Sequence, residues 1–207
     1  MADREAVLAA VSEDGQALFV APEELQADEE VVLAAIAADG SAFEHAADSL
    51  RCSKEFVLKA LAVSGEALEF ASAKLQADKE VVLAAVAQYG GALQHASEAF
   101  CDDKEVVLAA LAQGDGNPMR YMAESLQADR EVVLAGVAMD GAGLRYASAD
   151  LKADKELVLV AVGQDGCALE YAAEALQADE EVVRAAKEND EEALKFASAE
   201  LQGVLGP

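Results

Sequence analysis

The sequence predicts an all-α fold, an α-solenoid of eight helix-turn-helix repeats that together form a curved superhelix. Similar segments recur every 25 or 26 residues, from residue 3 to about residue 203. Each segment holds two apolar runs with helical spacing and a glycine between them, and no run shows the alternation of a β-strand. Because the repeats fill the chain, we expect residues 1–207 to form a single solenoid domain. The repeats begin at Asp3, Asp28, Ser53, Asp78, Asp103, Asp129, Asp154 and Asp179.

The opening Asp or Ser of each repeat predicts the start of the first helix, because these side chains cap free backbone N–H groups. A Glu two residues later is present in all eight repeats and complements the helix dipole. A Val follows two residues after that Glu in every repeat, and a Leu comes next in seven. We expect these Val and Leu columns to form the buried face of a helix of ~11 residues.

A glycine follows the first helix in seven repeats, for example Gly15 and Gly40, and predicts a left-handed C-cap. The second helix is expected to be shorter, with an apolar stripe at i, i+3 and i+7 that includes Leu18 and Phe43. Helices this short are marginal alone in water, so their stability must come from stacked neighbours.

The last repeat differs from the others in ways that predict a polar cap. Arg184 and Lys187 replace apolar residues, and Glu191 replaces the glycine. The first repeat departs less, with Val20 and Pro22 in its second run. Its cap is therefore either weaker or covered by another chain.

The charge of the chain restricts its partners. The 207 residues include 15 Lys and Arg against 40 Asp and Glu, a net charge of −25. Nucleic acids and anionic membrane surfaces are disfavoured as partners, because proteins bind both mainly through positively charged residues. No uncharged stretch is long enough to span a bilayer, so we expect no direct membrane insertion.

The N-terminus MADREAVLAA has acidic residues at positions 3 and 5 and lacks the basic start and apolar core of a secretory signal. The three cysteines have unrelated contexts and no C-x-x-C spacing. The cytoplasm or another reducing compartment is the simplest interpretation. The alternative is an organelle such as a plastid, after removal of a transit peptide.

Units such as DKEVVLAAVAQYGGALQHAS, which starts at Asp78, resemble the helical repeat family catalogued as domain of unknown function 4116, over essentially the whole chain. Repeats of this family are common in algae and other protists and occur in some intracellular bacteria. The resemblance implies an interaction role and supplies no catalytic residues. A single-residue insertion in repeat five departs from the regular pattern.

Residues with metal-binding or nucleophilic potential have a structural interpretation in this pattern. His45 and His95 fall in a column that is otherwise mostly aromatic, two repeats or ~20 Å apart, too far to share a metal ion. Cys52, Cys101 and Cys167 lie in different columns of different repeats, so we expect no disulfide. We therefore expect no catalytic residues, no metal site and no cofactor.

The many carboxylates are expected at helix starts, where the next residue is basic in six repeats and partly compensates them. The alternative is an acidic rail for a basic partner, most plausible at Glu29 and Glu180, where the basic residue is itself replaced by Glu.

Repeat five holds the strongest irregularity, the turn Gly114 to Pro118, and adaptable or interface-prone residues follow it. We hypothesise a partner-binding site there; harmless insertion with repacking is the alternative. The site residues are Met119, Arg120, Tyr121, Met122, Arg145 and Tyr146.

The function favoured by these observations is a non-catalytic scaffold whose acidic surface binds protein partners, which are themselves basic or parts of a multi-subunit complex. The alternative is a peripheral structural subunit of an organellar or membrane-associated assembly, such as an algal photosystem-antenna complex. A consensus-like designed array is a further alternative.

Overall fold

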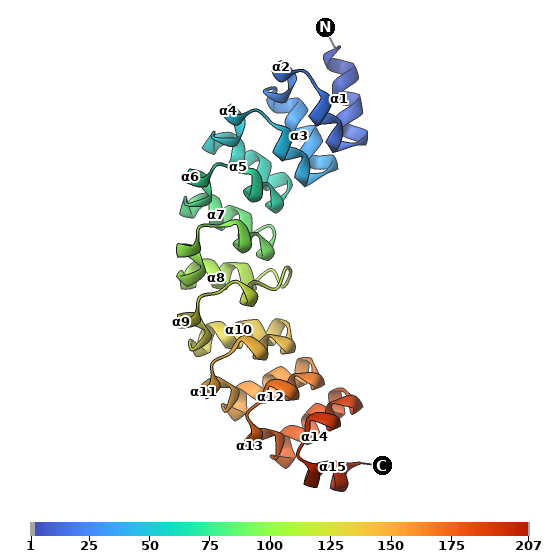
Figure 1. Cartoon of the computed structure of the whole chain (residues 1–207), viewed down its shortest axis with the longest axis vertical. Coiled ribbons are helices and arrows are strands. Elements are labelled where there is room, and N and C mark those ends of the chain that lie inside the picture. The colour runs from blue at the N-terminus through green and yellow to red at the C-terminus, as the bar shows by residue number, and fades with distance from the viewer. Residues whose placement is uncertain (1–2, 207) are drawn as a thin grey trace. The chain divides into compact units, whose positions relative to one another are not determined.

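A computed structural model describes residues 3–206, and every regular element in this range is helical (Figure 1). The chain divides into two compact units, Met1–Pro118 and Met119–Pro207, and the division falls in repeat five. Each unit is a stack of tandem helical repeats, which confirms the predicted all-α solenoid repeats. No helix in the described part of the chain combines the length and apolarity needed to span a membrane.

A regular repeat contains three helical segments where the sequence predicted two. A long α-helix of eight to ten residues comes first, a six-residue 3-10 helix follows, and a four-residue α-helix completes most repeats. In unit 1 the elements are α1 (Arg4–Glu13), η1 (Gly15–Val20), α2 (Glu23–Gln26), α3 (Glu29–Ala38), η2 (Gly40–His45), α4 (Asp48–Arg51), α5 (Lys54–Val63), η3 (Gly65–Phe70), α6 (Ala73–Gln76), α7 (Lys79–Val86), η4 (Gly90–His95), η5 (Glu98–Asp102) and α8 (Lys104–Leu111).

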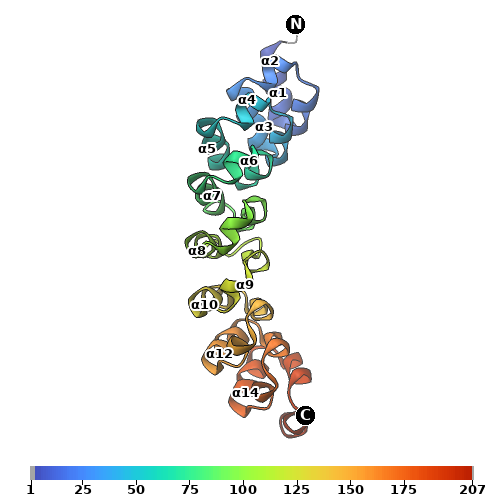
Figure 2. The same cartoon turned by 60° about the vertical axis from the view of Figure 1, so that its left-hand side comes forward.

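Unit 2 repeats the same order after the short segment η6 (Pro118–Arg120), which begins at the end of unit 1. Figure 2 shows its long helices stacked in one column, with the shorter segments beside them. Its elements are α9 (Glu124–Gln127), α10 (Arg130–Met139), η7 (Gly141–Tyr146), α11 (Ala149–Lys152), α12 (Lys155–Gln164), η8 (Gly166–Tyr171), α13 (Glu174–Gln177), α14 (Glu180–Asn189), η9 (Glu191–Phe196) and α15 (Ala199–Leu205).

The predicted N-caps are confirmed. Asp28 has an extended backbone, and its carboxylate accepts hydrogen bonds from the N–H groups of Glu30 and Val31. Ser53 caps α5 in the same way through the N–H of Phe56. The first residue of each repeat therefore satisfies part of the unpaired backbone at the start of the long helix.

The long helix does not end at the glycine, and the predicted left-handed C-cap is wrong. Most long helices end one residue earlier, at an Asp whose extended backbone closes the helix and whose carboxylate caps the 3-10 helix. Asp39 does both: its N–H donates to the Ala35 carbonyl, and Oδ1 accepts from the N–H of Ser41. Positive φ angles occur only at Gly114, Gly116 and Asn117 among the described residues, all in the irregular turn of repeat five.

The glycine is required for packing between repeats. A Cβ atom on Gly15 would lie 2.5 Å from the carbonyl oxygen of Ala35, on the long helix of the next repeat. A Cβ on Gly65 would lie 3.0 Å from the equivalent Ala85 carbonyl oxygen. A larger residue would therefore force successive repeats apart.

In place of the predicted second helix, most repeats have a 3-10 helix followed, after two non-helical residues, by a short α-helix. A glutamine from the short α-helix stabilises the 3-10 helix. Nε2 of Gln76 donates to the carbonyl oxygens of Leu68 and Glu69, and Gln177 does the same for Leu169 and Glu170. These side chains satisfy carbonyl groups that a longer helix would pair internally.

Backbone hydrogen bonds also join successive repeats on the side of the short helices. The carbonyl of Gln26 accepts from the N–H of Ala47, and that of Gln177 accepts from Ser198, both at 2.9 Å. Pro22 occupies the donor position in the first repeat and has no N–H to offer. The first repeat is therefore not built to continue this bonding toward the N-terminal side.

The core of each unit lies between the long helices and the 3-10 helices. The Val column is fully buried from the second repeat onward, for example Val32 and Val158 at 0% exposure. The rings of Phe43 and Phe56, from successive repeats, lie 5.9 Å apart between centroids. The adjacent Leu column is half-buried, so the predicted buried face is confirmed for the Val column and only in part for the Leu column.

Candidate partner-binding surface

The predicted site after the turn of repeat five separates into buried and exposed residues. Met119 and Met122 are 2% and 5% exposed, so the two methionines belong to the core of unit 2 and offer no contact surface. Gly136 and Gly143 replace the alanines of most other repeats, and both lack the Cβ that would collide with Sδ of Met119. The longer Met side chain fills the space left by these two glycines.

The two arginines of the predicted site are exposed at equivalent positions of successive repeats, on η6 and η7. Arg120 lies over the ring of Tyr121 at 6.0 Å from the guanidinium carbon to the centroid, and Arg145 lies over Tyr146 at 4.7 Å. Both rings are half-buried. Hydrogen bonds to Tyr146 and Tyr171 also raise the pKa of Arg145, so this guanidinium is held by the tyrosines around it while its residue stays exposed. An exposed arginine resting on an aromatic ring is suited to contact with carboxylates or carbonyls.

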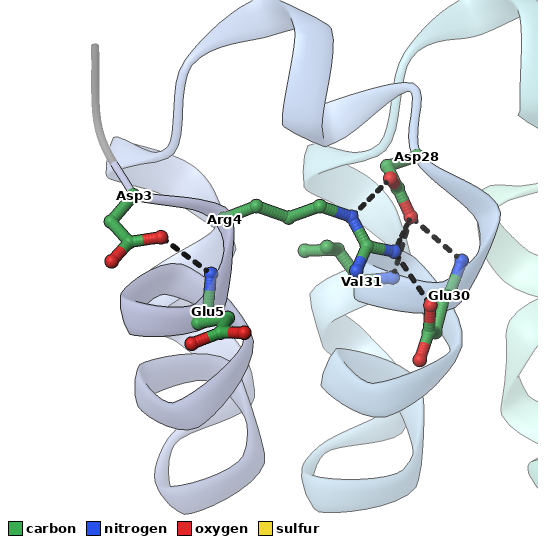
Figure 3. A network of polar contacts seen from close by, with 6 residues as sticks. All are labelled: Asp3, Arg4, Glu5, Asp28, Glu30 and Val31. Carbon is green, nitrogen blue, oxygen red and sulfur yellow. Dashed lines mark hydrogen bonds and ion pairs between the residues drawn. The ribbon is translucent and has the colours of Figure 1, made fainter.

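An ordered ion-pair network lies along the starts of the long helices, and Figure 3 shows its first contact. Arg4 reaches from α1 to the start of α3, where Nε lies 2.8 Å from Oδ2 of Asp28 and Nη2 lies 2.6 Å from Oε2 of Glu30. The hydrogen bond from Arg4 is the main cause that lowers the pKa of Asp28, and the N–H groups of Val31 and Glu30 lower it further. The cap carboxylate therefore stays ionised down to acid pH.

The same contact recurs between successive repeats within each unit, with N–O distances of 2.7–2.9 Å. It joins Lys54 to Asp78 and Glu80, Lys79 to Asp103 and Glu105, Arg130 to Asp154 and Glu156, and Lys155 to Asp179 and Glu181. Each cation faces two carboxylates. One negative charge per repeat therefore remains along this edge, which we call the acidic edge.

The two glutamates predicted to be most available to a basic partner are paired. Lys59 of α5 contacts Glu29 of α3 at 3.0 Å and Glu55 of its own helix at 3.1 Å. Glu180 accepts two hydrogen bonds from Arg184, one turn later on α14. The acidic edge is more uniform than the sequence suggested, because Lys59 supplies the cation that position 29 lacks.

Within the described residues, large apolar side chains are exposed at four places. Val63 and Met139 end α5 and α10 on the outer side of the long helices, at 47% and 54% exposure. Phe19 and Val20 of the first repeat are 67% and 79% exposed, and the Phe19 ring contacts His45 at 5.1 Å between centroids. Val204, in α15, is also exposed. The position of Phe19 is polar or charged in every other repeat.

The histidines and cysteines do not gather into a cluster in the described residues. Nε2 of His45 lies 2.9 Å from Oε1 of Gln16, whereas Nε2 of His95 lies 3.7 Å from Oε2 of Glu69. Cys52, Cys101 and Cys167 are free thiols, and burial is the main cause that raises the pKa of the last two. Across residues 3–206, no three potential metal ligands converge, and no polar or charged residue is fully buried.

Comparison with known proteins identifies the repeat. The model of the family described as domain of unknown function 4116 matches residues 3–46, 28–76, 78–127, 129–177 and 154–202. No curated protein and no solved structure matches the chain. Because these matches cover nearly the whole sequence, the chain belongs to the domain of unknown function 4116 family.

Proposed function

We propose that this protein is a non-catalytic scaffold that binds basic protein partners through its acidic surface. The acidic edge is the observation that carries this proposal, because each cation there is shared by two carboxylates. The excess is present in both units. Unit 1 holds 22 acidic and 7 basic residues, and unit 2 holds 18 and 8.

Fixed charges of this kind favour partner binding. The carboxylates are held by caps and ion pairs, so a partner cation meets acceptors that are already oriented. A field of one sign also increases association rates with proteins of opposite charge. Repeats present the same pattern several times, which allows an extended partner to make several weak contacts at once.

Affinity capture at two salt concentrations tests the proposal. The tagged protein is incubated with extract of its native cells at about 0.1 M and about 1 M salt, where the Debye length falls from ~10 Å to ~3 Å. We expect basic proteins at low salt and their loss at high salt. Acidic partners, or no partners at either concentration, would contradict the proposal.

The predicted arginine site supplies a second variant for the same experiment. Reversing Arg120 and Arg145 to Glu should reduce capture of a partner that places carboxylates on η6 and η7, since both arginines are exposed, and it should not reduce capture of a partner bound only at the acidic edge. Unchanged capture would remove these residues from the binding surface and leave the acidic edge as the remaining candidate.

A peripheral structural subunit of a larger assembly is the second candidate, and the exposure of Phe19 and Val20 favours it. Large apolar side chains exposed side by side are typical of surfaces that a partner covers. A structural subunit would be captured with a fixed set of proteins in constant ratio, and the set would persist at high salt. A variable set that high salt removes favours the scaffold.

A further inference from the structure

The outer side of α10 and α12 carries apolar residues that remain partly exposed. Val133 and Val158 point inward and are fully buried, whereas the following residues are half-buried or exposed. Residues at i, i+1, i+4 and i+5 share one side of a helix, and α10 and α12 pack against each other. We call this surface the outer face: Leu134, Ala135, Ala138 and Met139 of α10 with Leu159, Val160 and Gly163 of α12.

Folding does not require apolar residues at these positions. Arg184 and Glu188 of α14 occupy the positions of Leu159 and Gly163, and Lys59 of α5 occupies that of Val160. Charged residues at these three sites are accommodated in the same kind of helix. The partly exposed apolar residues of the outer face are therefore free to serve another role, such as contact with a partner.

The acidic edge borders the outer face. Glu156 lies three and four residues before Leu159 and Val160, on the same side of α12. Nη2 of Arg130 lies 2.9 Å from Oε2 of Glu156, but Arg130 is also paired with Asp154. Lys155 is shared by Asp179 and Glu181 in the same way. The border of the apolar surface therefore keeps a negative charge at each repeat.

We infer that the outer face binds an amphipathic helix of a partner protein, with its apolar side on Leu134, Leu159 and Val160 and with Lys or Arg residues toward the acidic edge. This inference rests on the proposed scaffold function and specifies its surface and partner. The small Ala135, Ala138 and Gly163 let the backbone of a helix approach closely. The residual charge at the edge is complementary to the basic residues.

The spacing of the repeats predicts the spacing of charge in the partner. Packed helices lie ~9 Å apart, and an α-helix rises ~1.5 Å per residue. A helix that crosses α10 and α12 therefore meets a new residual negative charge about every six residues. A basic residue at about that interval, beside an apolar stripe, is the expected signature.

Peptide binding tests the inference on the full-length protein. The probe is a fluorescent amphipathic helical peptide of Leu and Lys, and fluorescence anisotropy measures its affinity. A peptide with Glu in place of Lys is the control ligand, and we expect it not to bind. The variant Leu159→Arg should weaken binding of the Lys peptide by about tenfold, as for a central contact residue.

The control variant is Ala175→Arg, which adds the same charge on the exposed surface of α13. Lys74 occupies the equivalent position of α6, so a cation is compatible with the fold there. We expect the affinity to change less than about twofold, the effect of a remote surface charge. An equal loss in both variants would overturn the outer face as the binding site.

Folding must be retained for this comparison, and Arg184 indicates that Arg is tolerated at position 159. Circular dichroism of the Leu159→Arg and Ala175→Arg variants checks that both retain the helical fold. The second variant, Val160→Lys, places a lysine at the position that Lys59 occupies in α5. It should also weaken binding of the Lys peptide. Strong binding by Leu159→Arg and Val160→Lys would overturn the inference.

Two other occupants of the outer face are outcomes of the same experiment. A dimer seen by light scattering that Leu159→Arg converts to monomer would assign the face to a second copy of the chain and overturn the helix partner. Co-sedimentation with neutral phospholipid vesicles that the same variant abolishes would assign it to a membrane surface. If basic proteins are captured but the outer-face variants bind peptide normally, only this inference fails. If none is captured, the scaffold proposal itself fails.

Discussion

The inner and outer sides of the long helices in unit 2 follow different rules, and α12 and α14 show the difference. On the inner side both helices bury equivalent residues completely, such as Val158 and Val183. On the outer side Leu159 of α12 corresponds to Arg184 of α14, and the helix is formed in both cases. Packing between repeats therefore determines the inner side, whereas the outer side is open to selection for binding.

The largest expected effect on stability comes from comparing one substitution on the inner side of α12 with one on its outer side. Leu157→Ala removes a fully buried side chain and should lower the free energy of unfolding by about 3 kcal/mol. Leu159→Ala removes a half-buried side chain and should cost about 1 kcal/mol. Urea denaturation measures both. Equal losses would place Leu159 in the core and contradict the distinction.

A pair of glycines gives the next largest effect, with opposite signs. A Cβ on Gly136 would collide with Sδ of Met119, so Gly136→Ala should destabilise the protein by about 1–3 kcal/mol. A Cβ on Gly163 would meet no atom within 4 Å, so Gly163→Ala should stabilise the helix by up to about 1 kcal/mol.

Thermal denaturation of these two glycine variants checks the signs. The double variant Gly136→Ala with Met119→Leu should recover part of the loss, because Leu is shorter and occupies this position in other repeats. No recovery would show that the collision with Met119 is not the cause.

The fold was predictable because its strongest signals are periodic. The opening Asp28 or Ser53, the following Glu and the buried Val each recur with the repeat, so their roles could be assigned from spacing alone. The role of Gly15 could not be assigned, because a glycine after a helix looks the same whether φ is positive or the next repeat is close. The contact between Gly15 and Ala35 depends on the distance between repeats.

The candidate site was predictable only in part. Replacement of a Leu by Met119 suggested an unusual surface, but Gly136 and Gly143 had already made room for it in the core. The signal was in the sequence, as two glycines at positions where most repeats have alanine. The pairing of Lys59 with Glu29 crosses 30 residues, and no local pattern shows it. Half-burial of the Leu column depends on what covers the helices and not on their own periodicity.

Removing a cation from the acidic edge should have a smaller effect on the free energy of unfolding, and this effect should depend on pH. The hydrogen bond from Lys155 lowers the pKa of Asp179 below its ordinary value of 3.8. A carboxyl with a lowered pKa contributes stability above its unfolded-state pKa and loses it as the pH falls through its folded-state pKa. Lys155→Met should therefore be less stable than wild type at neutral pH.

The difference between wild type and Lys155→Met should shrink as the pH falls below 3.8 and through the lowered folded-state pKa of Asp179, and it should disappear once Asp179 is protonated in both proteins. Urea denaturation at several pH values measures it, and comparing the two proteins at each pH removes the effect of the other carboxylates. High salt should reduce the difference at pH 7, because the pair is partly exposed. A difference that grows toward acid pH would contradict the role of this pair.

The smallest expected effect on stability comes from making the outer side of α14 apolar. Arg184→Leu with Glu188→Ala gives α14 an outer side like that of α10, and we expect a change of less than about 0.5 kcal/mol, as for other surface substitutions. If the outer face is a helix-binding surface, the same variant lengthens it by one helix and should bind the Leu–Lys peptide more tightly than wild type. Weaker binding would show that the charges of α14, rather than the apolar residues of α10 and α12, attract the peptide. Tighter binding with unchanged stability would show that the outer side can be altered for recognition without disturbing the inner side.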